Sequence, residues 1–287
     1  MKEAINFGYL PAEFSDPKTA GIVIVPVAYD GTSTWMKGAD KGPAAIIEAS
    51  ANMELYDIET DSEVFKKGIF TEDAIGGEIS VAEMMENVRR IVQDYLARDR
   101  FTIVVGGEHS VSIGSVKAHA DRFANLSVLQ LDAHADLREE YNGSKYNHAC
   151  VMARIKEICP IVQVGVRSMD SSEKERMDKS RVFFAENLQT DTDWIEKVIS
   201  TLSQDVYITV DLDVLDPAIM PSTGTPEPGG LLWYDVLKML KAVSGRKRIV
   251  GFDVVELCPD ERNKAPDFLA AKLIYKLLSY TFGDRNG

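Results

Sequence analysis

Six short apolar segments, separated by stretches of helical periodicity, are the feature that most limits the fold of this 287-residue chain. Their Val and Ile content is typical of buried β-strands. We expect strands at 21–25, 101–105, 126–131, 161–164, 206–210 and 248–252. We expect helices near 43–52, 81–98, 110–124, 191–202, 231–243 and 265–280. This alternation favours a three-layer α/β/α fold, in which helices cover both faces of a mainly parallel sheet.

The sequence shows no sign of a domain boundary. No linker rich in Pro, Gly or Ser, no charge block and no internal repeat divides it, and 45% of its residues are hydrophobic. A chain of this length and composition can bury one large α/β core. We therefore expect a single domain over residues 1–287.

Charge and cysteine content limit the partners and the compartment. A net charge of −13 argues against sequence-independent nucleic-acid binding, which needs a basic surface. The chain starts without a signal-peptide pattern, and no stretch approaches the roughly 20 apolar residues of a membrane span. The odd number of cysteines, without Cys-x-x-Cys spacing, favours reduced thiols in a cytoplasmic protein, at Cys150, Cys159 and Cys258.

Three polar islands, each directly after an apolar run, contain six side chains of metal-ligand type. They are His109, Asp132, His134, Asp136, Asp211 and Asp213. Isolated Asp-x-Asp pairs occur by chance in a chain with 45 acidic residues, but only four histidines are present and two lie in these islands. The i, i+2 spacing would place neighbouring ligands on one face of an extended chain. Burial of so many unpaired ionisable groups requires a compensating cation.

The islands should meet at one place, because open α/β sheets bind ligands outside the carboxyl ends of their strands. Two imidazoles with four carboxylates and no thiolate suit Mn²⁺, Mg²⁺ or another first-row ion. Four carboxylates are too many for one such ion beside two histidines. Two ions about 3.5–4 Å apart would use them all and would lower the pKa of a shared water. The pattern predicts a two-metal hydrolytic site that attacks carbon or phosphorus.

The three islands, in this order, resemble the signatures of the ureohydrolase family, the arginases and agmatinases. Further segments resemble the family at 25–33, 38–43, 222–230 and 254–259, so that the match covers nearly the whole chain. This resemblance implies an arginase-like fold, two Mn²⁺ ions and cleavage of a small cationic guanidino substrate to urea and an amine. It also implies a homo-oligomer, a trimer or a hexamer. From the net charge and the lack of a long apolar stretch, we expect no binding to nucleic acid or to a membrane.

The resemblance also implies two ligand sets that share two bridging aspartates. One ion would be held by His109, Asp132, Asp136 and Asp211, and the other by His134, Asp132, Asp211 and Asp213. A metal-bound hydroxide would attack the guanidinium carbon. Asp136 would then pass a proton to the leaving nitrogen.

Two residues outside the ligand set are candidates to handle the substrate. Glu256 follows the apolar run 249–255, and a carboxylate can accept paired hydrogen bonds from a planar guanidinium. His148 resembles the family's proton-shuttling histidine and would contact the substrate. The alternatives are an exposed loop glutamate and a structural histidine. His119 lies in an expected helix and should be a surface or packing residue.

Substrate choice should depend on the loop after Asp136. Residues 137–148 resemble bacterial and archaeal agmatinases rather than the Thr- and Asn-rich loop of arginases. We therefore expect conversion of agmatine to putrescine and urea. Guanidinobutyrase or arginase activity is the alternative, because Arg138 would bind a carboxylate if it points inward. Glu108, where Asp is frequent, and Ala149-Cys150, where Gly-Thr or Gly-Ser is often seen, leave the substrate open.

A catalytically silent, metal-binding regulatory homologue is the alternative from a different class. Such a protein would be expected to lose at least one residue that acts on the substrate. Asp136, His148 and Glu256 are all present, which favours the enzyme. Cys150 is given no nucleophilic role, because the metals already supply the nucleophile.

Overall fold

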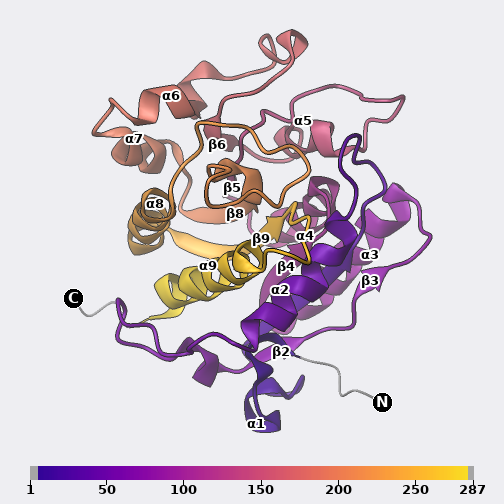
Figure 1. The fold of residues 1–287 in the computed structure, drawn as a ribbon, viewed down its shortest axis with the longest axis vertical. Helices are drawn as coiled ribbons and strands as arrows, with labels where there is room; N and C mark the ends of the chain where they lie inside the picture. The colour runs from indigo at the N-terminus through magenta and orange to yellow at the C-terminus, as the bar shows by residue number, and fades with distance from the viewer. Residues whose placement is uncertain (1–5, 284–287) are drawn as a thin grey trace.

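A parallel β-sheet forms the centre of the computed structural model, which describes residues 6–283 (Figure 1). Within these residues the sheet has nine strands in the order β2-β1-β4-β9-β8-β5-β6-β7, and β3 also pairs with β1. Every strand pair recorded there is parallel. The strands are β1 Ile22–Ala28, β2 Ile69–Thr71, β3 Ile75–Gly76, β4 Phe101–Gly106, β5 Leu126–Leu131, β6 Ile161–Val166, β7 Val182–Phe184, β8 Asp205–Asp211 and β9 Arg248–Val255.

Helices cover both faces of the sheet. On one face, α9 packs between α2 and α8, and α8 also contacts α7. On the other face, α4 packs between α3 and α5. Figure 1 shows α2 and α9 side by side. The α-helices are α1 Ala12–Ser15, α2 Gly42–Ser50, α3 Val81–Leu96, α4 Ser112–Arg122, α5 Val151–Lys156, α6 Ala185–Leu188, α7 Trp194–Thr201, α8 Trp233–Arg246 and α9 Ala265–Phe282. The expected three-layer fold is confirmed.

Alternation along the buried strands explains why two helix layers are needed. In β1, Ile22 and Ile24 belong to the core under α2, α8 and α9, whereas Val23 and Val25 belong to the core under α3 and α4. Successive side chains of a strand point to opposite faces, so a strand that is apolar throughout must be covered on both.

The six expected strands are present with small shifts of their ends, as are the six expected helices. The elements that were not expected are short, namely β2, β3, β7, α1, α5 and α6. Segments of two to six residues contain too few positions for a hydrophobic period to stand out. His119 is fully buried in α4, with Nδ1 2.8 Å from the Ser115 carbonyl oxygen, so its packing role is confirmed.

The strand order brings the predicted islands together. β4, β9, β8 and β5 are consecutive in the sheet, and they end at Gly106, Val255, Asp211 and Leu131. Because the strands are parallel, their carboxyl ends lie along one edge of the sheet. The islands and Glu256 therefore start from four neighbouring strand ends.

Two further observations concern membrane-spanning helices and disulfide bonds. None of the helices within residues 6–283 combines the length and the apolar character needed to cross a bilayer. All three cysteines are free, which confirms that no disulfide frame holds the fold.

Candidate metal centre and active site

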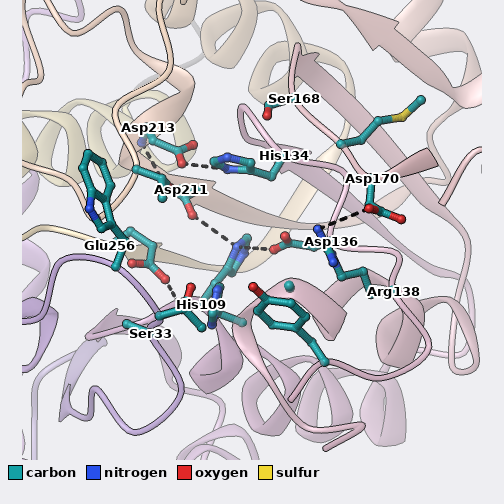
Figure 2. Close-up of a pocket in the computed structure, with 18 of the residues that line it drawn as sticks. Ser33, His109, His134, Asp136, Arg138, Ser168, Asp170, Asp211, Asp213 and Glu256 are labelled. Carbon is teal, nitrogen blue, oxygen red and sulfur yellow. Dashed lines mark hydrogen bonds and ion pairs between the residues drawn. The ribbon is translucent and has the colours of Figure 1, made fainter. Parts of the chain in front are cut away.

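A polar cavity of about 270 Å³ opens at these four strand ends (Figure 2). Its wall includes residues from every island together with Glu256 and His148. Figure 2 shows His109, His134, Asp211 and Asp213 pointing toward a common space.

The six predicted ligands form one cluster. His109 Nδ1 lies 3.2 Å from Asp132 Oδ2, 3.1 Å from Asp136 Oδ2 and 3.4 Å from Asp211 Oδ2. His134 Nδ1 lies 2.9 Å from Asp213 Oδ2 and 3.5 Å from Asp132 Oδ1. Two groups of ligand atoms could therefore each hold a cation, one formed by His109, Asp132 and Asp211 and the other by Asp132, His134 and Asp213. Asp132 belongs to both groups and offers one oxygen to each.

Local turns aim the aspartates into the cavity. Asp132 Oδ1 accepts a hydrogen bond from the His134 backbone N–H at 2.6 Å, and Asp211 Oδ1 accepts one from the Asp213 N–H at 2.9 Å. Such contacts to the residue two positions on stabilise tight turns. The extended chain expected for the third island is wrong, because residues 212–214 form a 3₁₀ helix that begins directly after Asp211.

Two site residues adopt left-handed backbone conformations. Asp136 has φ 51° and Glu256 has φ 68°, a region that residues with a Cβ rarely occupy. Backbone hydrogen bonds hold both, since the Ala153 N–H donates to the Asp136 carbonyl and the Glu256 N–H donates to the Gly107 carbonyl. Gly107 is required there, because a Cβ would collide with the Tyr29 carbonyl oxygen. Strain of this kind is tolerated where the surrounding structure holds a side chain for function.

Hydrogen bonds through Thr209 and Asp253 fix the orientation of the His109 ring. Its Nε2 lies 2.9 Å from Thr209 Oγ1, and that hydroxyl donates to Asp253 Oδ1 at 2.6 Å. With its proton given to Asp253, Thr209 can only accept from the ring, so Nε2 carries a hydrogen and Nδ1 is the nitrogen that can give its lone pair to a cation. Buried Nδ1 has no hydrogen-bond partner among the described residues, although three carboxylate oxygens surround it. A divalent cation bound to both the ring and the carboxylates fits this arrangement.

Sequence reasoning missed Thr209 and Asp253. Both lie inside segments that were interpreted as apolar strands, β8 and β9, and both are fully buried. The available signal was the charge of Asp253 in the middle of an apolar run, since a buried carboxylate needs partners.

The electrostatics of the cluster favour positive charge. Burial raises the pKa of Asp211 well above its ordinary range, and Asp213 and Asp132 add to the effect. Burial and the charge of Asp132 raise the pKa of Asp136 to about 7. Burial alone would lower the pKa of His134, but Asp213 and Asp132 raise it to about 12. Without cations these groups would hold protons, so metal and protons compete for the same atoms.

Glu256 and His148 lie beside the cluster, as expected from the sequence. Glu256 is half-buried, and its Oε1 accepts the backbone N–H of His109 at 2.7 Å. Burial raises the pKa of Glu256, and the charge of Glu108 adds to this. Burial lowers the pKa of His148 to about 4, which keeps its imidazole neutral. Its ring packs edge-on against Tyr141, with 6.0 Å between the centroids.

Arg138 does line the cavity, but its charge is not free. Its guanidinium lies 4.6 Å from the Tyr141 ring centroid. Nη2 is 3.9 Å from Asp170 Oδ2, and Nε is 4.0 Å from Glu173 Oε2 (Figure 2 labels Arg138 and Asp170). Sequence reasoning missed these two acids, although they follow β6 at the same edge of the sheet.

Cys150 is buried, and burial raises the pKa of its thiol to about 11. A thiol of this kind carries almost no thiolate near neutral pH, and the thiolate is the nucleophilic form. The chemistry of Cys150 therefore agrees with the absence of a nucleophilic role.

Comparison with known proteins places this geometry in a family. The model of the Arginase family matches residues 20–279. This chain belongs to the Arginase family. The resemblance to arginases and agmatinases that its motifs predict is confirmed.

Relatives within the Arginase family are similar over nearly their whole length. The chain is 35% identical over 276 residues to the N(1)-aminopropylagmatine ureohydrolase of Synechocystis sp., covering 91% of this chain and 89% of that protein. It is 32% identical over 270 residues to the agmatinase of Pyrococcus horikoshii, covering 92% and 93%. The crystal structure of the agmatine ureohydrolase of Thermoplasma volcanium matches with a TM-score of 0.86 and 30% identity, covering 98% and 95%. The arginase-like fold is thereby confirmed.

Metal binding is expected to release protons. Near pH 7 the metal-free cluster holds protons on His134 and in part on Asp136, whose pKa values are about 12 and about 7. Mn²⁺ must displace them, so its affinity should fall as the pH is lowered. Calorimetric titration in buffers of different ionisation enthalpy measures the number released. A binding heat that does not depend on the buffer would contradict this prediction.

Replacing Thr209 by Val should weaken metal binding without removing a ligand. The valine keeps the shape of the strand residue but leaves His109 Nε2 without its acceptor, so the ring loses its fixed orientation. Loss of such a supporting contact typically costs about 10- to 100-fold in metal affinity. Thr102→Val is the matched control, because it removes a hydroxyl 3.2 Å from His119 Nε2, outside the cavity. Equal metal affinity of Thr209→Val and wild type would show that the contact is unimportant.

Proposed function

We propose that this agmatinase-like ureohydrolase, a single domain over residues 1–287, cleaves agmatine to putrescine and urea with two Mn²⁺ ions. The observation that carries the proposal is the cluster of six ligand side chains, five of which line one cavity together with Glu256 and His148. A hydrolytic site for guanidines needs an activated water, a carboxylate that orients the guanidinium and a group that moves a proton. This cavity offers side chains for each task.

The ligand cluster would hold the two ions in overlapping sets. His109, Asp132, Asp136 and Asp211 would form one set, and His134, Asp132, Asp211 and Asp213 the other. The geometry supports Asp132 as a bridge, since its two oxygens face different histidines. An oxygen-rich set without thiolate suits Mn²⁺. When bound, the two ions would supply the Lewis acidity that makes water nucleophilic near neutral pH.

Glu256 is proposed to orient the guanidinium. One of its oxygens is engaged by the His109 N–H, which fixes the plane of the carboxylate. The remaining acceptor positions can take N–H groups of a planar guanidinium. Such a contact would hold the substrate carbon over the ion cluster. Its left-handed backbone keeps Glu256 directed at this position.

Asp136 and His148 are proposed to move the proton. Asp136 lines the cavity and lies 3.1 Å from His109, so its carboxylate is placed where it could accept a proton and return it. Asp136 would carry a proton to the leaving nitrogen, which departs as a neutral amine. His148, neutral and on the cavity wall, would exchange that proton with solvent.

The far end of the cavity suits a cationic tail. Asp170 Oδ1 is engaged by the Ser172 N–H and hydroxyl, while Oδ2 faces Arg138 at 3.9 Å. Two carboxylates, Asp170 and Glu173, lie near one guanidinium, so the local charge is negative. An ammonium is therefore favoured there over the carboxylate of arginine or guanidinobutyrate.

N(1)-aminopropylagmatine is the second candidate substrate. Four relatives of that name are 31–36% identical to this chain. Its tail carries one more amine than agmatine. Trp35, which is largely exposed at the cavity, offers an aromatic surface on which a protonated amine can bind.

The reaction is tested by urea release. Mn²⁺-loaded protein is incubated with agmatine, N(1)-aminopropylagmatine, arginine and guanidinobutyrate, and kcat/KM is measured for each. Agmatine or its aminopropyl derivative should exceed arginine and guanidinobutyrate, because only the first two have a tail with an ammonium and no carboxylate. No urea from any of the four would contradict the hydrolase. A higher kcat/KM for arginine would contradict the substrate class.

Glu256→Gln should lower kcat/KM without loss of metal. A hydrogen bond to a charged group contributes about 1.5–3 kcal/mol, so removal of the charge should cost roughly 10- to 150-fold. Glu261→Gln removes the same charge from an exposed position in the same loop and serves as the control. Metal content is measured for both. Wild-type kcat/KM in Glu256→Gln would exclude its role in orienting the guanidinium.

A further inference from the structure

The hydroxyl of Thr32 joins two parts of the site that are far apart in the sequence. Thr32 Oγ1 lies 2.9 Å from Glu108 Oε2, 2.9 Å from the His148 backbone N and 3.1 Å from His148 Nδ1. Glu108 precedes the ligand His109 and is fully buried. A hydroxyl has one hydrogen and two lone pairs, so these three contacts use its whole hydrogen-bonding capacity.

The direction of each hydrogen bond follows from the partners. The backbone N–H of His148 can only donate, so it occupies one lone pair of Thr32. Glu108 also receives the Ser110 N–H at 3.1 Å and the Ser110 hydroxyl at 2.6 Å, as suits a carboxylate acceptor. The Thr32 hydrogen is therefore given to Glu108. The second lone pair remains for His148 Nδ1, which must carry a hydrogen to use it.

We propose that Thr32 and Glu108 are positioning residues that hold His148 in the tautomer with hydrogen on Nδ1. His148 lines the cavity, and Nδ1 is engaged, so the unprotonated Nε2 is the ring nitrogen left for a substrate. This tautomer allows Nε2 to accept a proton, after which the imidazolium can donate it again. The inference rests on the proposed proton-moving role of His148.

The length of Glu108 matters for this contact. Its carboxylate spans from Ser110, on its own turn, to Thr32 in the loop after β1. Aspartate at the same backbone position is one methylene shorter and would not reach both. The Glu in place of Asp, which was noted from the sequence as a departure from the family pattern, thus supplies the acceptor that sets the direction of the Thr32 hydrogen bonds.

The first test is a double-mutant cycle on the Mn²⁺-loaded enzyme. Thr32→Val removes the hydroxyl but keeps the shape, and it should lower kcat by about 10- to 100-fold with a smaller change in KM. Thr32→Ser keeps the hydroxyl and should restore kcat. In a His148→Ala background, Thr32→Val should have little further effect, because the residue through which it acts is absent. An equal loss of kcat in both backgrounds would overturn the proposal.

Thr102→Val is the matched control for the cycle, since it breaks a hydroxyl–histidine contact at His119 outside the cavity. It should change the melting temperature but not kcat. Metal content is measured for every variant. A loss of metal in Thr32→Val that accounts for its loss of kcat would assign Thr32 to the metal centre instead, and would also overturn the proposal.

The second test determines the tautomer of His148 by NMR and does not depend on catalytic activity. The full-length protein, ¹⁵N-labelled at its four histidines, is saturated with diamagnetic Mg²⁺, and the His148 resonances are assigned with His148→Ala. Long-range ¹H–¹⁵N spectra should show the hydrogen on Nδ1 in wild type and a changed pattern in Thr32→Val. Hydrogen on Nε2 in wild type would overturn the inference. If wild type has hydrogen on Nδ1 but releases no urea, the proposed function fails while the tautomer assignment stands.

Discussion

The crowding of four aspartates in a buried cluster is the constraint on which the rest of the site depends. Asp132, Asp136, Asp211 and Asp213 are each less than a tenth exposed, and their mutual repulsion raises the pKa of Asp136 and Asp211 after the larger effect of burial. Such a cluster is costly unless positive charge compensates it. The parallel sheet provides the rigid frame, because its neighbouring strands hold the first residues of each island at a fixed spacing.

A second regularity is that threonine hydroxyls orient two histidines of the site, His109 and His148. Thr209 gives its hydrogen to Asp253 and accepts from His109, whereas Thr32 gives its hydrogen to Glu108 and accepts from His148. In each case a buried carboxylate decides which ring nitrogen carries the hydrogen. The outcome differs because the rings are held by opposite nitrogens. His109 presents Nδ1 to the cluster, and His148 presents Nε2 to the cavity.

The ligands could be predicted from the sequence because each follows an apolar run, and strand ends meet at one edge of a parallel sheet. The residues that hydrogen-bond to the site histidines could not be predicted in this way. Threonine is common in strands, so Thr209 looks like an ordinary strand residue until its neighbour Asp253 is placed beside it. The link from Thr32 to His148 spans 116 positions and depends on how two loops meet. The direction of Arg138 depends in the same way on its stacking against Tyr141.

The charges of Asp170, Glu173 and Arg138 link the fold to the choice of substrate. Glu173 is held by N–H groups of Leu137 and Asp170, at 2.7 and 2.6 Å, so it joins the loop after β5 to the loop after β6. This contact joins the loops that carry Arg138 and Asp170, and both residues line the cavity. A guanidine whose tail ends in a carboxylate would be attracted by Arg138 but repelled by Asp170 and Glu173. A tail that ends in an ammonium would be repelled by Arg138 and attracted by the two acids. With two carboxylates against one guanidinium, the balance of charge favours the ammonium.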